Sequence, residues 1–510
     1  MEQRSSNKLD RFLHDEFTFP KAILTMTNAD DSRLPRRSDG PTLNRRQWLA
    51  AGGAISAAAI VPRHVLGGPR FVAPSDKINV ALVGAGGRGL QNARELMKLS
   101  DVRIPIVVDP AQQWDLKDFY YRGLAGREPV RQIIETHFRE NEPGFQCRGL
   151  ADFREMLAEP NNGIDAILCA TPDHLHATVS IAAMKAGKHV YCEKPLTHNV
   201  AEARRVAEVA RESGVATQMG NQGHSRDTIR ETCELIWAGA IGDVQAVHAW
   251  VPATRWNKGM QAPPTDSQPL PAGLDWDLWC GPRVPPDFHS AYAPVAWRDF
   301  WTFGCGAMGD FGCHDLDSAV WALDLGMPTS VEMHAAGNTH PDMAPWGEIG
   351  YFDFSSARVG KDPNKRSPIR VHWYSGGLKP SRPTQLPHGT NLPSRGVLFI
   401  GSEGVLVCGG AGGPADLYPV KRREAVGQVP QSLPRSAGHH RDWIDAIKGQ
   451  GSASSEFHYG AKLTEITLLG LVALRSRERI EYDAEAMKVT NSDPADQLLH
   501  GQYRNGWELA

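Results

Sequence analysis

A glycine-rich run, Gly84-Ala85-Gly86-Gly87-Arg88-Gly89, constrains the fold of this 510-residue chain more than any other feature. The apolar residues 78–83 before it predict a buried strand, and Leu90, Ala93 and Leu96 after it fall on one face of a helix. A strand, a glycine turn and a helix in this order open a βαβ unit, which builds a parallel sheet.

The same alternation continues through residue 219. Further strands are predicted at residues 101–109, 164–170, 188–191 and 216–219, and helices at 151–157, 177–186 and 201–213. Pro105 in the second strand is typical of an edge strand or of a strand that starts slightly later. The alternation indicates a doubly wound parallel sheet.

After residue 222, polar and proline-rich stretches separate short alternating strands. These strands are predicted at residues 244–251, 330–335, 349–354, 369–374, 397–400 and 405–408, with a tight hairpin at 401–404. Helices at 439–447 and 461–474 are expected to pack on this sheet or on the first domain. The predicted fold class is α/β, with an N-terminal Rossmann doubly wound sheet and a C-terminal α/β domain whose large, open sheet is mostly antiparallel.

The spacing Gly84-x-Gly86-x-x-Gly89 matches the fingerprint of a dinucleotide-binding loop. Its glycines let the backbone approach a pyrophosphate, and the following helix presents its positive end to that group. Asp109 ends the next strand, where a carboxylate would bind the ribose hydroxyls of NAD and repel the 2′-phosphate of NADP. NAD is therefore favoured, while Arg88 leaves NADP open as an alternative.

Two later motifs follow strands of the first sheet, at the edge where α/β folds bind ligands. Glu193-Lys194-Pro195 follows the strand 188–191, and we interpret Lys194 as a catalytic residue beside the dinucleotide. Thr171 and Pro172 follow the strand 164–170 and are expected to line the nicotinamide. His174 and His176 are either ligands or proton carriers, or they cap and pack the next helix.

Asp310 and His314 lie four residues apart in a glycine-rich segment that opens a helix. On a helical turn they share one face, so the aspartate can orient the histidine as a general base. By spacing alone, a capping aspartate at a helix N-terminus is the more common arrangement.

Together these motifs resemble the Gfo/Idh/MocA family, named for glucose-fructose oxidoreductase and inositol dehydrogenase. The motifs are the glycine loop, Thr171-Pro172-Asp173-His174-Leu175-His176, Glu193-Lys194-Pro195, Met219-Gly220-Asn221-Gln222 and residues 309–317, in the family's order within residues 77–480. The resemblance implies NAD(P) between a Rossmann domain and an α/β domain, with Lys194, Asp310 and His314 as the catalytic lysine, aspartate and histidine. It also implies a homo-oligomer, a dimer or tetramer, that assembles through the sheet face.

The predicted sites and domains follow from these motifs. We expect the cofactor to contact Gly84, Gly86, Gly87, Arg88, Gly89, Asp109, Thr171, Pro172, His176, Glu193, Lys194 and Asn221. A chain of 510 residues is too long for one compact core. We divide it into an N-terminal extension (1–70), an NAD(P)-binding Rossmann domain (71–222), a substrate and oligomerisation domain (223–480) and a C-terminal tail (481–510).

Composition excludes several classes of partner. With 55 basic and 58 acidic residues the net charge is −3, which gives no field that would recruit nucleic acid or an anionic membrane. The eight cysteines contain no C-x-x-C pair, so neither a metal site nor a disulfide framework is predicted. Cys192, beside Lys194, is interpreted as a packed strand residue rather than as an activated thiolate.

The segment Asn44-Arg45-Arg46-Gln47-Trp48-Leu49, with the Ala- and Gly-rich run that follows it, has the layout of a twin-arginine export signal. The alternative is an ordinary amphipathic helix after a basic loop, but Ala-Gly-Gly-Ala is a poor helix core. We therefore expect export by the twin-arginine machinery to the periplasm or another extracytoplasmic location. A nicotinamide enzyme there has no ready pool of free cofactor, so it should retain its dinucleotide and restore it within each cycle.

The hypothesis for the reaction is that His314 accepts the proton of a sugar or polyol hydroxyl while hydride moves to the nicotinamide. Lys194 stabilises the developing alkoxide or is itself the proton acceptor, and Asp310 holds the geometry. Of six tryptophans between residues 250 and 301, most are expected to pack and one or two to line the sugar pocket: Trp250, Trp256, Trp276, Trp279, Trp297 and Trp301.

Three functions remain open at this point. The first is net oxidation of a sugar, polyol or glycoside, and the second is NAD-dependent glycoside hydrolysis or lysis through transient oxidation. The third, a non-catalytic NAD-binding sensor, is disfavoured because Lys194, Asp310 and His314 are all present.

Overall fold

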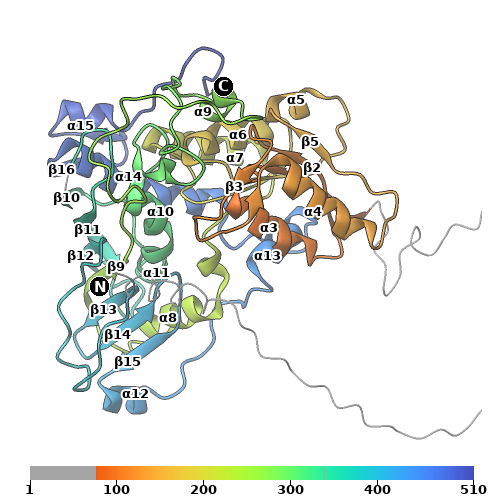
Figure 1. Cartoon of the computed structure of the whole chain (residues 1–510). Helices are drawn as coiled ribbons and strands as arrows, with labels where there is room; N and C mark the ends of the chain where they lie inside the picture. Colours follow the sequence, from red (N-terminus) through yellow and green to blue (C-terminus); the bar gives the residue numbers. More distant parts are fainter. Residues whose placement is uncertain (1–75, 338, 510) are drawn as a thin grey trace, which may run out of the picture. The chain divides into compact units, whose positions relative to one another are not determined.

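The computed structural model describes residues 76–337 and 339–509 (Figure 1). The predicted extension and its twin-arginine segment, residues 44–49, lie outside the described residues. Among the described residues, no helix is both long and apolar enough to cross a bilayer.

Six parallel strands form the first sheet, in the order β5-β2-β1-β6-β7-β8. They are β1 (Ile78–Val83), β2 (Val102–Val108), β5 (Arg148–Leu150), β6 (Ala166–Cys169), β7 (His189–Cys192) and β8 (Thr217–Met219). In β1, Val80 and Leu82 belong to one apolar core, and Ala81 and Val83 belong to the other. Because both faces are apolar, helices cover the sheet on both sides, and the predicted doubly wound fold is confirmed.

Two sets of helices cover this sheet (Figure 1). One face packs against α3 (Gly87–Met97), α4 (Arg127–Arg139) and α13 (His439–Ile447), and the other packs against α5 (Phe153–Ala158), α6 (Asp173–Lys185) and α7 (Val200–Ser213). Trp443 of α13 is fully buried in the core of the first sheet. The chain therefore returns to its first sheet after building the second.

Pro105 lies inside β2, which is not an edge strand, so the edge-strand interpretation is wrong. β5 pairs only with residues 106–108 of β2, and the register of β1 with β2 shifts between Asn79 and Ala81. Pro105 therefore lies just before the pairing with β5 begins and at the irregularity in the pairing with β1, where its missing N–H interrupts no regular ladder.

Nine strands form the second sheet, in the order β15-β14-β13-β9-β12-β11-β10-β16-β17. They are β9 (Val244–Trp250), β10 (Ser330–Ala336), β11 (Gly347–Arg358), β12 (Arg366–Tyr374), β13 (Gly396–Gly401), β14 (Val405–Gly409), β15 (Ala415–Tyr418), β16 (Ile480–Asp483) and β17 (Lys488–Val489). Every neighbouring pair is antiparallel except β9 with β12, which confirms the mostly antiparallel sheet. The predicted hairpin joins β13 to β14, and Gly401 N–H donates to Gly404 O at 2.8 Å.

Helices on the inner face of the second sheet connect it to the first domain. They are α8 (Asp227–Trp237), α10 (Gly306–Asp315), α11 (Asp317–Ala322) and α14 (Phe457–Ser476), and they share one apolar core with β9, β11 and β12. From α14, Thr464 Oγ1 accepts a hydrogen bond from Leu196 N at 3.2 Å, and Glu465 pairs with Arg204 at 2.6 Å. In the same core, α10 lies beside the chain that follows β7, where Asp310 pairs with Lys194.

Residues 110–126, between β2 and α4, form a hairpin of β3 (Trp114–Asp115) and β4 (Leu124–Ala125). Strands of two residues carry no periodic pattern, so we do not predict this hairpin from the sequence. Its turn carries Tyr120 and Tyr121.

Candidate active site

The glycine loop has the three geometries that a dinucleotide-binding turn requires. Gly84 has a φ of +92°, and a Cβ there would lie 2.5 Å from the backbone carbon of Ala170. A Cβ on Gly89 would lie 2.0 Å from Gly84 O, so this glycine allows α3 to pack against the turn. A Cβ on Gly86, in contrast, would meet no atom of the described residues within 4 Å. The loop therefore leaves an open cradle at the N-terminus of α3, where a pyrophosphate fits.

Asp109 follows β2 and holds the glycine loop. Its Oδ2 accepts a hydrogen bond from Ala85 N at 2.7 Å, and its Oδ1 accepts one from Ala111 N at 2.8 Å. Burial raises the pKa of this carboxyl to about 6. Asp109 lies at the predicted strand end and braces the turn, and its contact with a ribose stays a prediction.

Arg88 is directed toward Glu193, at the end of β7. Its Nε lies 2.9 Å from Glu193 Oε1, which also accepts from Asn92 and Gln222. Burial would raise the pKa of Glu193, but the charge of Arg88 and these hydrogen bonds lower it to about 2. Because Arg88 is engaged with this carboxylate, it offers little support for NADP.

Lys194 is held by the carboxylate of Asp310, on α10. Its Nζ lies 2.5 Å from Asp310 Oδ1 and 2.7 Å from Asp310 O. Arg298, on the 3-10 turn η4 (Ala296–Asp299), approaches the same oxygen, with Nε at 3.4 Å from Oδ1. Burial opposes ionisation of Asp310, but the charges of Lys194 and Arg298 outweigh it and hold the pKa well below its ordinary value.

His314 lies one helical turn after Asp310, as predicted, but the aspartate does not orient it. Asp310 hydrogen-bonds to Lys194, and among the described residues His314 Nδ1 is buried without a hydrogen-bond partner. Burial, followed by the charge of Lys194, holds the pKa of His314 well below its ordinary value. The expectation that Asp310 orients His314 is therefore wrong, because the charged lysine outcompetes a neutral imidazole for the carboxylate.

Several buried polar atoms near Lys194 have no partner among the described residues. They are Glu193 Oε2, Asn221 Oδ1 and His314 Nδ1. The side-chain nitrogen of Asn221 donates to Asp317 Oδ2 at 3.0 Å, which fixes the amide and leaves its oxygen available. Buried polar atoms without partners are uncommon in proteins, and a bound ligand is one way in which they are satisfied. With the open cradle at Gly86, they fit an elongated ligand that reaches from the glycine loop to Lys194, as a nicotinamide dinucleotide does.

The two histidines of the third motif are packed. His174 has its ring nitrogens 3.2 Å from Phe303 O and 3.0 Å from Trp279 O. His176 has its Nδ1 2.6 Å from Pro195 O and its Nε2 2.8 Å from Thr171 O. The packing alternative therefore describes both residues, and His176 braces the two loops that flank Lys194.

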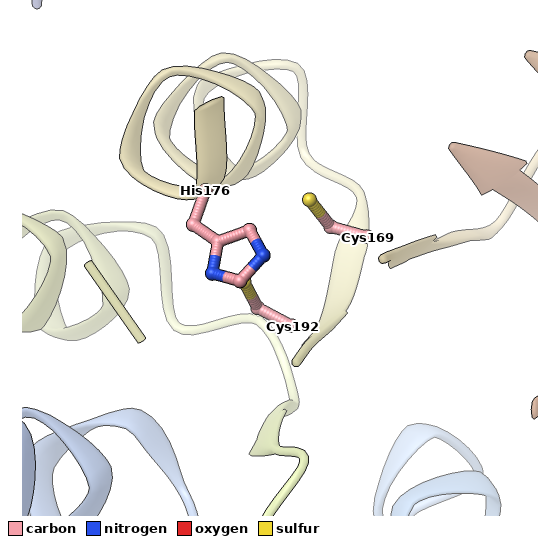
Figure 2. A group of neighbouring side chains, drawn as sticks. All are labelled: Cys169, His176 and Cys192. Atoms are coloured by element: carbon pink, nitrogen blue, oxygen red, sulfur yellow. The ribbon is translucent and has the colours of Figure 1, made fainter. Parts of the chain in front are cut away.

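Cys169, His176 and Cys192 form a buried cluster whose ligand atoms all lie within 4.8 Å of one another. Figure 2 shows His176 reaching from α6 toward the two cysteines, which are paired in register on β6 and β7. Both ring nitrogens already face carbonyl oxygens, so a metal would have to displace one of these contacts. Burial raises the pKa of Cys192, which makes it a packed thiol rather than a thiolate.

The tryptophan-rich segment is mostly core. Five of the six tryptophans are buried, namely Trp250, Trp276, Trp279, Trp297 and Trp301. Trp256 is only partly buried, and its ring stacks on Tyr120 at 5.8 Å between centroids. Trp256 is therefore the one candidate of the six for a sugar-binding surface.

Arg298, beside Asp310, and Tyr121, whose ring lies against Gly87 of the glycine loop, border the site but are missed from the sequence. Each comes from a short turn or hairpin without a periodic pattern, and each reaches the site only through tertiary packing. Asp173, within the third motif, is also close, since the charges of Arg298 and Asp310 act on it after burial, and its pKa rises to about 7. The spacing of the motif does not reveal that Asp173 lies close to Arg298 and Asp310.

Comparisons with known proteins agree with this fold. The family described as Gfo/Idh/MocA oxidoreductase, NAD-binding Rossmann fold, matches residues 78–221, and the family's C-terminal alpha/beta domain matches residues 247–362. Together the two matches cover just over half of the chain.

Two curated relatives are similar over part of the chain. Levoglucosan dehydrogenase of Pseudarthrobacter phenanthrenivorans is 25% identical over 253 residues, which is 48% of this chain and 51% of that protein. A glycosyl hydrolase family 109 protein of Stenotrophomonas maltophilia is 29% identical over 154 residues, which is 30% of this chain and 29% of that protein. The chain thus spans about half the length, or less, of these relatives.

Among solved structures, the WlbA dehydrogenase of Bordetella pertussis, in complex with NADH and UDP-GlcNAcA, shares the fold. Its TM-score is 0.50 at 16% identity, over 80% of this chain and 99% of that one. With the two family matches in their expected order, the chain belongs to the Gfo/Idh/MocA family of oxidoreductases and carries that family's NAD-binding Rossmann domain.

Proposed function

We propose that the protein oxidises a hydroxyl group of a sugar, polyol or glycoside by hydride transfer, with a tightly bound NAD. One observation carries the proposal. The Nζ atom of Lys194 is fixed 2.5 Å from Asp310 Oδ1, and one helical turn later the buried Nδ1 of His314 has no partner among the described residues. This arrangement offers a hydrogen-bond donor and a proton acceptor at the edge of the first sheet, where α/β folds bind ligands.

In the proposed mechanism, Lys194 donates a hydrogen bond to the substrate oxygen as negative charge develops on it. Asp310 and Arg298 keep the ammonium aimed, because the carboxylate lies between the two cations. Bound NAD would accept the hydride from the carbon that carries the hydroxyl. His314 would take the hydroxyl proton on Nδ1, since its depressed pKa keeps the imidazole neutral near neutral pH.

Lys194 is the alternative proton acceptor. In that case His314 would orient the substrate hydroxyl through its free Nδ1. A His314→Asn variant distinguishes the two roles, because it keeps a hydrogen-bonding group but removes a basic nitrogen. Loss of turnover in this variant supports His314 as the base, and retained turnover assigns the proton to Lys194.

Carbohydrate substrates are supported by the relatives. One of them is named for levoglucosan, and the exposed part of Trp256 offers an aromatic face next to Tyr120. Such faces stack on the C–H groups of sugars. The identity of the sugar depends on loops, which carry no general code.

Export by the twin-arginine route is part of the proposal. The segment 44–49 has the required arginine pair before an apolar run. The route carries folded proteins, so the protein would leave the cytoplasm with its dinucleotide in place. A fusion of residues 1–75 to a reporter that needs this route would fail to reach the periplasm if the proposal is wrong.

A homo-oligomer is also proposed, through the outer face of the second sheet. Aromatic side chains lie side by side there, with the rings of His248 and His372 stacked at 4.3 Å and Tyr351 edge-on to His372 at 5.4 Å. A half-exposed aromatic surface of this kind is typical of a protein contact.

Glycoside cleavage through transient oxidation is the second candidate. It is favoured by the relative named as a glycosyl hydrolase family 109 protein. Both reactions begin with the same hydride transfer, so Lys194 and His314 serve either one. The two reactions differ in what reoxidises the bound, reduced cofactor. In the first it is a second sugar, and in the second it is the same sugar after bond cleavage.

One experiment tests the proposed function and separates its two forms. Purified protein is incubated with disaccharides, glycosides and polyols without added cofactor, and the products and the redox state of the bound nucleotide are measured. Oxidised sugar with reduced nucleotide supports the oxidoreductase, and bond cleavage without net redox change supports the second candidate. Bound nucleotide with no turnover on any substrate would contradict both and would favour a sensor.

A further inference from the structure

The hairpin formed by residues 110–126 is anchored in both parts of the molecule. On one side, Gly126 N–H donates to Ala85 O of the glycine loop at 2.7 Å. On the other side, Gln112 N–H donates to Gly273 O at 2.8 Å, and Asp275 N–H donates to Pro110 O at 3.1 Å. The hairpin therefore spans from the glycine loop to the segment that follows the second domain's first strand.

Tyr121 lies directly on the glycine loop. A Cβ built on Gly87 would fall 2.1 to 2.5 Å from three atoms of the Tyr121 ring, so the ring fills the space that a side chain at Gly87 would need. At the neighbouring Gly86 the same construction meets nothing within 4 Å. The ring therefore forms a wall beside the open cradle at the N-terminus of α3.

Tyr120 extends this wall away from the loop. Its ring centroid lies 3.9 Å from that of Tyr121, and it stacks on Trp256 at 5.8 Å with an interplanar angle of 20°. The side chain nevertheless remains 48% exposed. A large aromatic group left half exposed beside an open cradle is surface that a bound ligand can cover.

Arg298 connects the surroundings of the tyrosine pair with the carboxylate of Asp310. Arg298 Nε lies 3.4 Å from Asp310 Oδ1, and Arg298 is also close to the tyrosines. Burial would lower the pKa of Arg298, but Asp310, and after it Tyr121 and Tyr120, raise it. Tyr121 thus lies on the glycine loop, and both tyrosines act on Arg298, which pairs with the Asp310 that holds Lys194.

We infer that Tyr121 and Tyr120 retain the dinucleotide, as a strap laid along its path from the glycine loop to Lys194. The inference rests on the proposed function, because it assumes that the cradle at Gly86 holds the pyrophosphate. Release of the dinucleotide then requires the hairpin to lift from the loop, which slows dissociation. This property suits a protein that must carry its cofactor into a compartment without free nucleotide.

The test measures release of NADH from the loaded full-length protein, followed by the loss of nicotinamide fluorescence after dilution into excess NAD. Tyr121→Ala is expected to accelerate release by about ten- to hundredfold, as truncation of a central aromatic contact does. Tyr120→Ala should accelerate it less, and Tyr121→Phe, which keeps the ring, should leave it near wild type. Leu124→Ala is the matched control, because Leu124 lies on the same hairpin, is 47% exposed and, unlike Tyr121, supplies none of the atoms nearest to a Cβ built on the loop glycines.

Release from Tyr121→Ala at the wild-type rate would overturn the inference while leaving the proposed function intact. A wild-type protein that takes up no NADH would overturn both. If Tyr121→Ala does not fold, Tyr120→Ala decides, since its exposed ring can be removed without opening the core. Equal acceleration by Leu124→Ala would show that the whole hairpin, rather than the tyrosine pair, controls release, and would also overturn the inference.

Discussion

Replacing Asp310 with asparagine tests the charge arrangement of the site most sharply. The change keeps the size of the side chain and removes the negative charge that lies between Lys194 and Arg298. The Lys194 Nζ is 2.5 Å and the Arg298 Nε is 3.4 Å from Oδ1 of this carboxylate. We expect both the stability of the protein and its turnover to fall, because two partly buried cations lose their shared partner.

The magnitude follows from these separations. At an effective dielectric constant of about 20, the two attractions amount to roughly 7 and 5 kcal/mol before the cost of desolvation is subtracted. Removing one partner from a buried ion pair typically lowers the free energy of unfolding by about 3 to 5 kcal/mol. The asparagine oxygen and the carbonyl oxygen of residue 310 can still accept from Lys194, so we expect about 3 kcal/mol. Misplacement of Lys194 should lower kcat by about a hundredfold.

Urea unfolding followed by circular dichroism measures the stability difference, and its pH dependence has a definite sign. The pKa of Asp310 is depressed in the folded protein, so its contribution is present above the ordinary value of 3.8 and is lost as the pH falls below it. The gap between wild type and Asp310→Asn should therefore shrink in acid. Asp324→Asn is the matched control, because Asp324 is exposed and pairs with Arg366 at 2.9 Å, so the change should cost less than about 1 kcal/mol. An Asp310→Asn protein as stable and as active as the wild type would refute the reasoning.

Three further changes probe the cradle, the core and the sheet face. Gly86→Val puts a side chain where nothing lies within 4 Å, in an extended backbone that valine accepts, so it should fold normally but hold no nucleotide; a normal nucleotide content after gel filtration would contradict the cradle. Burial raises the pKa of Glu348 from 4.5 to about 7, so the wild type loses stability as the pH rises from 4.5 to above 7 and this carboxyl ionises. Glu348→Gln has no such carboxyl, so its free energy of unfolding should rise by about 3 kcal/mol relative to that of the wild type over this range. Urea unfolding across this range checks the change, and a pH-independent difference would count against it. The mass of Tyr351→Asp measured by light scattering should be that of a monomer, whereas the wild type should be an oligomer. A wild-type protein that is already monomeric would contradict the proposed interface.

The two sheets could be predicted because their apolar patterns are local. Val80 and Leu82 face one core while Ala81 and Val83 face the other, and this arrangement is already visible in the uninterrupted apolar run of β1. The hairpin β3–β4 could not be predicted, because its strands have two residues each and its position depends on contacts with residues 85 and 273. The helix α4 carried an available signal that we do not use, namely apolar residues at Val130, Ile134 and Phe138.

The sequence predicted which residues of the candidate site share a helical turn, but it did not predict which side chains they contact. The i, i+4 spacing correctly placed Asp310 and His314 on one helical turn, but spacing could not reveal that Lys194, from a distant strand, would take the carboxylate. Arg298 carries no motif, and only the packing of its short turn against α10 brings it to Asp310. Long-range electrostatic partners of this kind require the fold.

The measurement that tests the central claim most directly is a single-turnover comparison of wild type and Lys194→Ala, both loaded with NAD. Each is mixed with the panel of sugars, polyols and glycosides, and the absorbance of reduced nicotinamide is followed, with the nucleotide content of both proteins measured first. We predict that the two proteins hold equal amounts of nucleotide and that only the wild type forms reduced nicotinamide on at least one substrate. Equal formation by Lys194→Ala, or a wild-type protein that binds no nucleotide, would contradict the account.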